Sequence, residues 1–183
     1  MHYANIKRCD IANGPGVRTS LFVTGCTHRC PGCFNSVAWD FDYGRPFTRE
    51  TVEELVDSCR PAFVTGLSLL GGEPMEPENQ PSVLTLVRAF REALPGKTVW
   101  CYSGYTFEEL TGQKPARCRT SDTDALLGLM DVLVDGEFIA AEHDVSLRFR
   151  GSRNQRLLDL PASLRAGEPV PWEDDPVFST HSL

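Results

Sequence analysis

Short apolar segments alternate along this chain with longer segments in which apolar residues recur on one helical face. The short segments are rich in β-branched residues and predict buried strands at residues 19–24, 66–70, 98–102 and 131–136. The longer segments predict two helices, one beginning after Thr48 and ending before Pro61, the other running from about Ser82 to Pro95. Two shorter helices are predicted at residues 106–109 and 125–130. Because strands that alternate with helices are joined by crossovers, we predict an α/β fold with a parallel sheet.

The predicted strands end in residues suited to chemistry. A cysteine loop, residues 26–35, follows the first strand, Gly71-Gly72-Glu73-Pro74 follows the second, and Asp135 ends the fourth. In open α/β sheets and in barrels, sites are built at this edge of the sheet. A full eight-unit barrel typically takes about 250 residues, more than the 183 residues of this chain. An open, partial barrel or a doubly wound sheet is therefore expected.

The periodic pattern fades after Gln155. Four prolines and the acidic run Glu173-Asp174-Asp175 follow, without the spacing of a helix or a strand. We therefore predict one core domain over residues 1–155 and a peripheral or partly disordered tail over residues 156–183.

Composition indicates an ordinary globular protein, with 41% hydrophobic and 23% charged residues. The net charge of −7 argues against a nucleic-acid partner and favours small-molecule or protein partners. No segment approaches the roughly 18 consecutive apolar residues of a membrane span, and the first residues lack the pattern of a signal peptide. A cytoplasmic protein with no membrane contact is expected.

The chain has seven cysteines, an odd number that favours metal binding or redox chemistry over a disulfide framework. Three of them, Cys26, Cys30 and Cys33, form a C-x3-C-x2-C pattern inside the cysteine loop. The others lack ligand spacing and are expected to be small buried hydrophobes or idle thiols: Cys9, Cys59, Cys101 and Cys118.

Three kinds of chemistry suit this loop. Cys30 and Cys33 could act as a redox dithiol, which would leave Cys26 without a role. Structural zinc would need a fourth ligand, Cys9 or His28. A 4Fe-4S cluster would use all three cysteines and leave one iron free for a substrate or cofactor. The loop together with the turn at residues 71–74 favours the cluster.

These motifs resemble the radical S-adenosylmethionine (SAM) superfamily, and more closely its members that activate anaerobic (class III) ribonucleotide reductase. The resemblance covers roughly residues 1–155, and it implies an open, partial (β/α) barrel of the radical SAM type. The residues that carry it are 13–18 (NGPGVR), 25–35, 44–48, 69–74, 103–105, 132–138 and 150–155.

The resemblance implies a mechanism. Cys26, Cys30 and Cys33 would hold three irons of a 4Fe-4S cluster, and SAM would chelate the fourth. One electron from the cluster would cleave SAM to methionine and a 5′-deoxyadenosyl radical, which would remove a hydrogen atom from a glycine Cα of the reductase. The implied partners are the large subunit of anaerobic ribonucleotide reductase and an electron donor such as flavodoxin or ferredoxin.

The resemblance also implies roles inside the cysteine loop. Gly32 would allow close approach at the cluster, and the backbone around Gly32, Cys33 and Phe34 resembles the family's SAM contact region. His28 is expected to shape the surroundings of the cluster, because a fourth protein ligand would block SAM. Trp39, Trp100 and Phe34 are expected to pack and exclude water.

Further SAM contacts are implied at the ends of two strands. Gly71 and Gly72 would let the backbone lie along the methionine group, and Glu73 or neighbouring carbonyls would accept hydrogen bonds from its ammonium. Asp135 would orient SAM directly or through a cation. Leu70 departs from the family, whose members commonly have serine there.

Two alternatives accompany this interpretation. The chain could be a radical SAM enzyme that acts on another glycyl-radical enzyme or on a small molecule. From a different class, it could be a zinc or dithiol binding module.

Overall fold

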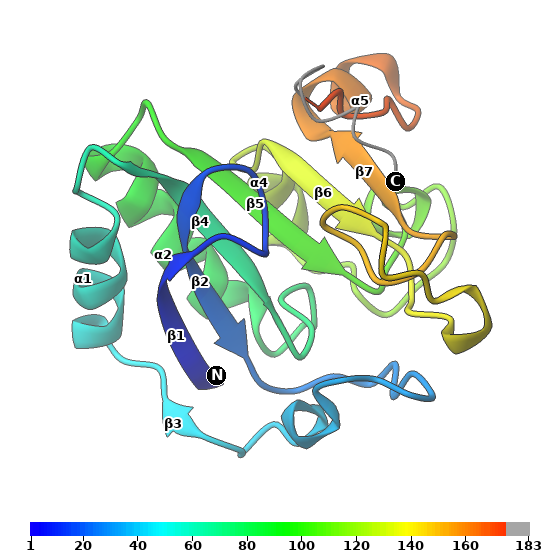
Figure 1. Cartoon of the computed structure of the whole chain (residues 1–183), viewed down its shortest axis with the longest axis horizontal. Coiled ribbons are helices and arrows are strands. Elements are labelled where there is room, and N and C mark those ends of the chain that lie inside the picture. The colour runs from blue at the N-terminus through cyan, green and yellow to red at the C-terminus, as the bar shows by residue number, and fades with distance from the viewer. Residues whose placement is uncertain (175–183) are drawn as a thin grey trace.

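Seven strands form one open sheet in the order β3-β1-β2-β4-β5-β6-β7 in the computed structural model, which describes residues 1–174 (Figure 1). The strands are β1 (His2–Asp10), β2 (Val17–Val23), β3 (Arg45–Pro46), β4 (Val64–Gly71), β5 (Thr98–Ser103), β6 (Val132–Asp135) and β7 (Arg156–Asp159). The helices are α1 (Arg49–Ser58), α2 (Gln80–Ala93), α3 (Phe107–Leu110), α4 (Thr123–Leu127) and α5 (Leu160–Ala166), with short 3-10 helices η1 (Ser36–Trp39) and η2 (Ala140–Glu142).

The four predicted strands are confirmed as the parallel centre of the sheet, β2, β4, β5 and β6. Each is buried along most of its length, which explains the continuous apolar segments in the sequence. The predicted helices are confirmed as well, and α1 begins with the expected cap at Thr48. The coarse fold prediction therefore holds as a mixed α/β structure whose sheet does not close on itself.

The sheet is not parallel throughout, which corrects the prediction. β1 pairs with β2, and β7 with β6, in the antiparallel direction. Neither strand has a strong apolar pattern. In β1 only Tyr3 and Asp10 are buried, and β7 is four residues long. Strands near a sheet edge carry polar residues that prevent further pairing, so periodicity alone does not reveal them.

Residues 156–166, at the start of the predicted peripheral tail, form β7 and α5, two elements that the fading pattern did not predict. Residues 170–172 then run beside β7, where Asp159 N donates to Val170 O over 3.0 Å and Trp172 N to Leu157 O over 2.8 Å. The division of the chain at residue 155 stays a prediction. Residues 175–183 of the predicted tail lie outside the described residues.

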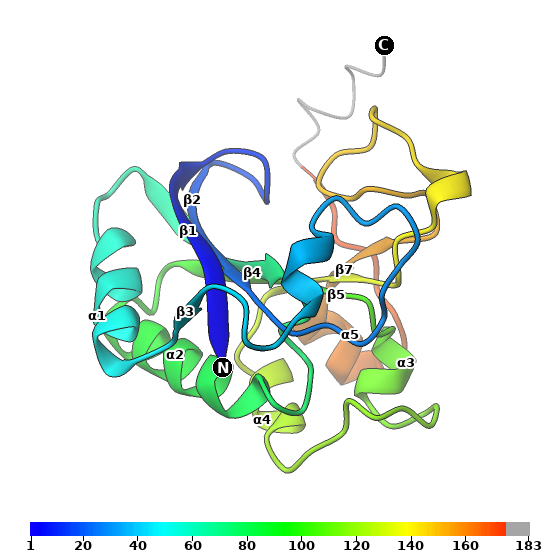
Figure 2. The same cartoon turned by 90° about the horizontal axis from the view of Figure 1, so that it is seen from below.

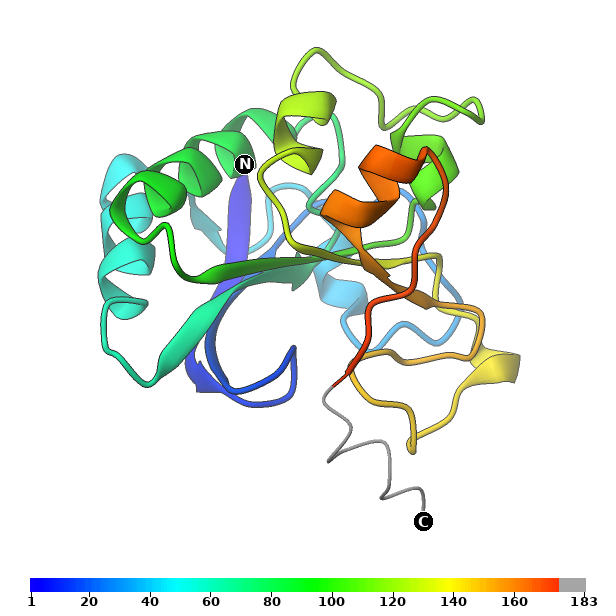
Figure 3. The same cartoon turned by 90° about the horizontal axis from the view of Figure 1, so that it is seen from above.

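Two hydrophobic clusters cover the two faces of the sheet. The larger one includes Val99, Cys101 and Leu133 and packs under the helices, which lie on one side of the sheet in Figure 3. The smaller one is built on Trp100 and the two valines of β6. Successive residues of β5 thus serve opposite faces, as the period of a strand requires. Among residues 1–174, no helix has the length and apolar character needed to cross a membrane.

The cysteine loop is fixed to the strand ends by backbone hydrogen bonds. Gly72 N donates to Val23 O over 2.7 Å, and Glu73 N donates to Gly25 O over 2.9 Å. At the other side of the loop entry, Gly25 N donates to Ala38 O over 2.8 Å. The start of the loop between β2 and η1 is therefore hydrogen-bonded both to the turn after β4 and to η1.

Gly72→Ala is expected to destabilise the protein by about 1–3 kcal/mol, because a Cβ here overpacks a site that cannot relax. That Cβ would lie 2.7 Å from Gly25 O and 2.9 Å from Ala38 O, both backbone atoms. Gly96→Ala is the matched control, since its Cβ would have no neighbour within 4 Å. Urea unfolding of both variants checks this, and equal stability losses would contradict it.

Asp10 joins β1, the following connection and β2 through one buried carboxylate. It accepts hydrogen bonds from Lys7 Nζ (2.8 Å), Ser20 Oγ (2.6 Å), Asn13 Nδ2 (2.5 Å) and Ala12 N (3.0 Å). Burial alone would raise the pKa of Asp10, but these donors outweigh it and lower the pKa from 3.8 to about 2.

The stability that ionised Asp10 contributes is therefore complete above pH 4 and is lost as the pH falls from about 4 towards 2. Asp10→Asn should lower the free energy of unfolding by about 2 kcal/mol at pH 6, and the difference from the unchanged protein should shrink below pH 4. Urea unfolding between pH 6 and pH 3 measures this. Asp57→Asn, at an exposed carboxylate of α1, serves as the control, and a difference for Asp10→Asn that does not change with pH would refute the assignment.

Candidate functional site

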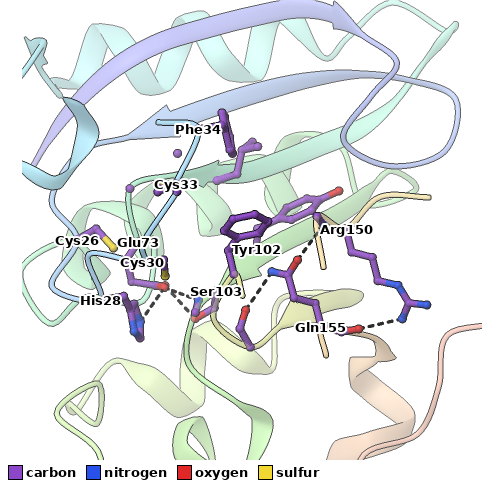
Figure 4. A pocket seen from close by; sticks show the side chains of 18 of the residues that line it. Cys26, His28, Cys30, Cys33, Phe34, Glu73, Tyr102, Ser103, Arg150 and Gln155 are labelled. Atoms are coloured by element: carbon purple, nitrogen blue, oxygen red, sulfur yellow. Dashed lines mark hydrogen bonds and ion pairs between the residues drawn. The ribbon is translucent and has the colours of Figure 1, made fainter. Parts of the chain in front are cut away.

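A cavity of about 690 Å³ lies at the C-terminal edge of the parallel strands (Figure 4). The cysteine loop, the ends of β4, β5 and β6, and the connection after β1 all line it. Seven residues between 138 and 151, which follow β6, line it as well, together with Gln155. Figure 2 shows residues 138–151, in yellow and gold, beside the blue cysteine loop. The predicted edge is therefore where a cavity is found.

Cys26, Cys30 and Cys33 are half-buried and all line this cavity. The loop turns tightly, because Cys33 N donates to Cys30 O over 3.1 Å and Gly32 has a φ of +78°. This left-handed backbone favours glycine at residue 32, whereas space does not require it, because a Cβ would meet no atom closer than 3.4 Å. Three thiols from one short loop thus face one space.

This donor set fits an iron–sulfur cluster better than a single ion. Within residues 1–174, no three His, Cys, Asp or Glu side chains are grouped so that they could hold one metal ion. Burial raises the pKa of the Cys26 thiol to about 12, with the Glu73 carboxylate adding to it, and burial also raises the pKa of Cys30. Metal binding must therefore displace protons from these thiols.

His28 attaches the cysteine loop to two strand ends. Its Nδ1 lies 2.6 Å from Glu137 Oε1, its Nε2 lies 3.4 Å from Glu73 Oε2, and its ring packs on that of Tyr105 with centroids 4.3 Å apart. Burial alone would lower the pKa of His28, but the two carboxylates raise it to about 9. The two carboxylates thus favour the protonated form of the His28 ring. Its ion pair with Glu73, drawn in Figure 4, connects the cysteine loop to the turn after β4.

Glu73 lines the cavity, but most of its hydrogen-bonding capacity is used within the protein. It is 1% exposed, and its carboxylate accepts hydrogen bonds from Met75 N (2.8 Å), Ser103 Oγ (2.9 Å) and Gly104 N (2.6 Å). The carboxylate thus joins the end of β4 to the end of β5. A cationic ligand group at Glu73 would therefore share the carboxylate with these donors and with His28.

Gly71 and Gly72 line the cavity, and the neighbouring backbone leaves no room for a side chain at either position. A Cβ on Gly71, whose φ is +114°, would lie 2.6 Å from Val23 O, and one on Gly72 would meet Gly25 O. Both positions are therefore glycine because β4 packs closely against β2 and the start of the cysteine loop. The preceding residue, Leu70, lines the cavity with an apolar side chain.

Asp135 lies outside the residues that line this cavity, so the structure does not bring it together with the other predicted SAM contacts. It is fully buried and accepts hydrogen bonds from Phe107 N (2.7 Å) and Arg156 Nε (2.9 Å). Arg156 also binds Glu108, whose pKa it lowers to about 2. Asp135 thus connects β6 to α3 and β7, and its neighbour Gly136 lines the cavity instead.

The three aromatic residues expected to pack behave differently. Phe34 is 85% exposed at the edge of the cavity, so the expectation that it packs and excludes water is wrong. Trp100 is 1% exposed, as predicted. Trp39 lines the cavity, and its buried Nε1 has no hydrogen-bond partner within residues 1–174.

Glu76 supports the cysteine loop, and the sequence analysis did not single it out. It is fully buried, and its Oε1 accepts hydrogen bonds from Thr27 N (2.7 Å) and Thr27 Oγ1 (2.6 Å), while Arg117 pairs with its Oε2. A single glutamate after a turn is usually a surface charge, so no local signal distinguishes it.

Comparison with known proteins supports an iron–sulfur cluster in this chain. Residues 12–158 match the family model described as a 4Fe-4S single cluster domain. The anaerobic ribonucleoside-triphosphate reductase-activating protein of Escherichia coli K12 is 40% identical over 157 residues, which cover 85% of this chain and 96% of the relative. The protein of the same name from Enterobacteria phage T4 is 37% identical over 159 residues, covering 86% and 93%.

A third relative of that name, from Haemophilus influenzae, is 36% identical over 157 residues, with 85% of this chain and 96% of the relative covered. Similarity of this degree along nearly the whole of each relative shows common family membership. This chain therefore belongs to the family of anaerobic ribonucleoside-triphosphate reductase-activating proteins and contains a 4Fe-4S single cluster domain.

Proposed function

We propose that this protein is a radical SAM enzyme that generates a glycyl radical on an anaerobic ribonucleotide reductase. One observation carries the proposal: three thiols of one loop face a cavity of about 690 Å³, and a fourth cysteine ligand does not line it. Cys26, Cys30 and Cys33 would hold three irons of a 4Fe-4S cluster and leave the fourth accessible from the cavity. The names of the relatives supply the reductase as the target.

The cavity has the volume of a small-molecule site, which is typically about 300–1,000 Å³. When bound, the cluster would supply one electron that breaks a carbon–sulfur bond of SAM, and the radical formed would take a hydrogen atom from a glycine Cα of the reductase. The electron would come from a donor such as a flavodoxin or a ferredoxin. The protein's own part is to bind, orient and shield these groups.

Six of the proposed SAM contacts line the cavity. They are Gly32, Cys33 and Phe34 on the cysteine loop, Gly71 at the end of β4, and Gly72 and Glu73 directly after it. Glu73 is the proposed acceptor for the ammonium of SAM, because a charge-assisted hydrogen bond to a buried carboxylate is strong. Asp135 is not carried into this proposal, since Arg156 and α3 use its carboxylate. The open sheet is compatible with a partial barrel of the radical SAM type, and the proposed reaction suits the cytoplasm.

Cys26→Ala is expected to abolish SAM cleavage. Loss of a metal ligand should exceed the roughly 10–100-fold effect of losing an outer-shell partner, so cleavage should fall below about one hundredth of the unchanged protein's rate. The measurement is 5′-deoxyadenosine formation after anaerobic reconstitution with iron and sulfide and then reduction, with iron content determined in parallel. Cys9→Ser is the control, because Cys9 is exposed and does not line the cavity. Cleavage that persists in Cys26→Ala would show that the cysteine trio is misassigned.

The reconstituted and reduced protein should also produce a glycyl-radical signal on the reductase. Electron paramagnetic resonance of the reductase, mixed with this protein and SAM, checks that result. Formation of 5′-deoxyadenosine without a reductase signal would point to another glycyl-radical enzyme or to a small-molecule substrate. Zinc at one per chain with no iron, in protein purified without oxygen, would instead indicate a binding module.

A further inference from the structure

The cavity wall made by Leu147, Phe149 and Arg150 faces the cysteine loop from the other side. Figure 4 shows Cys26 and Arg150 at opposite ends of the cavity in that view. Phe149 has a φ of +58°, a left-handed backbone that bulky residues rarely adopt. Such a conformation persists only where surrounding contacts hold it. What holds Phe149 therefore holds this wall.

Phe149 is held by two tryptophan side chains. Its ring packs on Trp100 with centroids 5.4 Å apart and an interplanar angle of 80°, and on Trp172 at 6.4 Å and 66°. Trp172 and Trp100 also contact each other, at 4.9 Å and 77°. These edge-to-face arrangements are favourable for aromatic rings. Each of the three rings thus contacts the other two, and Trp172 is the most C-terminal of the three residues.

Trp172 comes from a part of the chain that the family model does not include, because the match ends at residue 158. The segment that carries Trp172 is nevertheless firmly attached. Trp172 N donates to Leu157 O over 2.8 Å, and Val170 N donates to Ser163 Oγ on α5 over 2.9 Å. Two residues after Trp172, Asp174 pairs with Arg148, which lies next to Phe149.

An unpaired polar group beside this wall indicates that the wall faces a ligand. Tyr102 lines the cavity and packs against the same cluster as Phe149 and Trp172. Its hydroxyl is buried and has no hydrogen-bond partner in the part of the chain that the structure describes. A buried hydroxyl without a partner is costly, and a polar ligand group would relieve that cost.

We infer that Trp172 is a positioning residue for the ligand cavity. It acts through Phe149, fixing residues 147–150 in the conformation that bounds the cavity beside Tyr102. Since the ligand is taken to be SAM, this inference rests on the proposed function. Loss of the Trp172 ring would loosen the wall and weaken SAM binding, while the cysteine loop and its metal would keep their geometry.

The experiment compares Trp172→Ala with Trp172→Phe, which restores an aromatic ring, and with Leu164→Ala as the control. Leu164 lies on α5, in the same C-terminal region but outside both hydrophobic clusters. Hydrogen exchange of amides 147–151 is measured on the full chain before reconstitution. KM and kcat for SAM cleavage are then measured on the reconstituted protein, together with its iron content.

Trp172→Ala should accelerate exchange at amides 147–151 and raise the KM for SAM by about tenfold, the scale set by lost aromatic pairs. The kcat, the iron content and exchange in β2, β4 and β5 should stay unchanged. Trp172→Phe should recover most of the loss, and Leu164→Ala should behave like the unchanged protein. Unchanged exchange and KM would overturn the inference, as would a loss spread equally over the central strands.

The experiments distinguish a failure of the proposed SAM cleavage from a failure of the proposed role of Trp172. If the unchanged protein does not cleave SAM, the proposed function fails, and the exchange measurement still decides whether Trp172 holds the wall. If Trp172→Ala does not fold, Asp174→Asn takes its place, because it weakens the ion pair to Arg148. A rise of about threefold in exchange at residues 147–151 is then expected, on the scale of a partly exposed ion pair. No rise would refute the inference.

Discussion

The site depends on the hydrogen bonds and the ion pair that the buried carboxylate of Glu73 forms. A carboxylate without partners would be far too costly at this depth, and this one is surrounded by three donors and the His28 ring. These partners come from three places: the turn after β4, the end of β5 and the cysteine loop. Satisfying one charge thus requires three separate segments to meet, and their meeting defines one side of the cavity.

Glu76 repeats this arrangement one turn further along the same segment. Its carboxylate accepts hydrogen bonds from both the backbone amide and the hydroxyl of Thr27, the residue directly after Cys26. Arg117 joins the same carboxylate from the long polar connection between α3 and α4. The cysteine loop is therefore held at Thr27 by Glu76 and at His28 by Glu73. Support of this kind would order the cysteine loop before a cluster binds, which a site built on a short loop needs.

The parts of this structure that could be predicted from sequence are those with local signals. The central strands are buried on both faces and therefore appear as apolar segments, and the cysteine trio has its spacing within eight residues. The rest depends on distant contacts. Thr27 and Glu76 are 49 residues apart, and His28 and Glu137 are 109 residues apart, so no local pattern indicates either pair.

Asp135 illustrates how an unpredicted element changes the role of a correctly located residue. Its place at the end of a parallel strand was predicted, and such positions commonly face a ligand. The short antiparallel strand β7 was not predicted, and its first residue, Arg156, pairs with this carboxylate. With Arg156 and the first amide of α3 already bound, Asp135 stabilises the fold, and the cavity lies beyond Gly136.

The two sides of the cavity are held by physically different forces. On the cysteine side the carboxylates of Glu73 and Glu76 are at most 1% exposed, so dissolved salt screens their interactions weakly. On the opposite side the wall depends on three aromatic rings and on the partly exposed pair of Arg148 and Asp174. The cysteine side lies within the residues that match the family model, whereas Trp172 and Asp174 lie beyond them. The cysteine side is thus built within the residues that match the family model, and the opposite wall is completed by a segment outside that match.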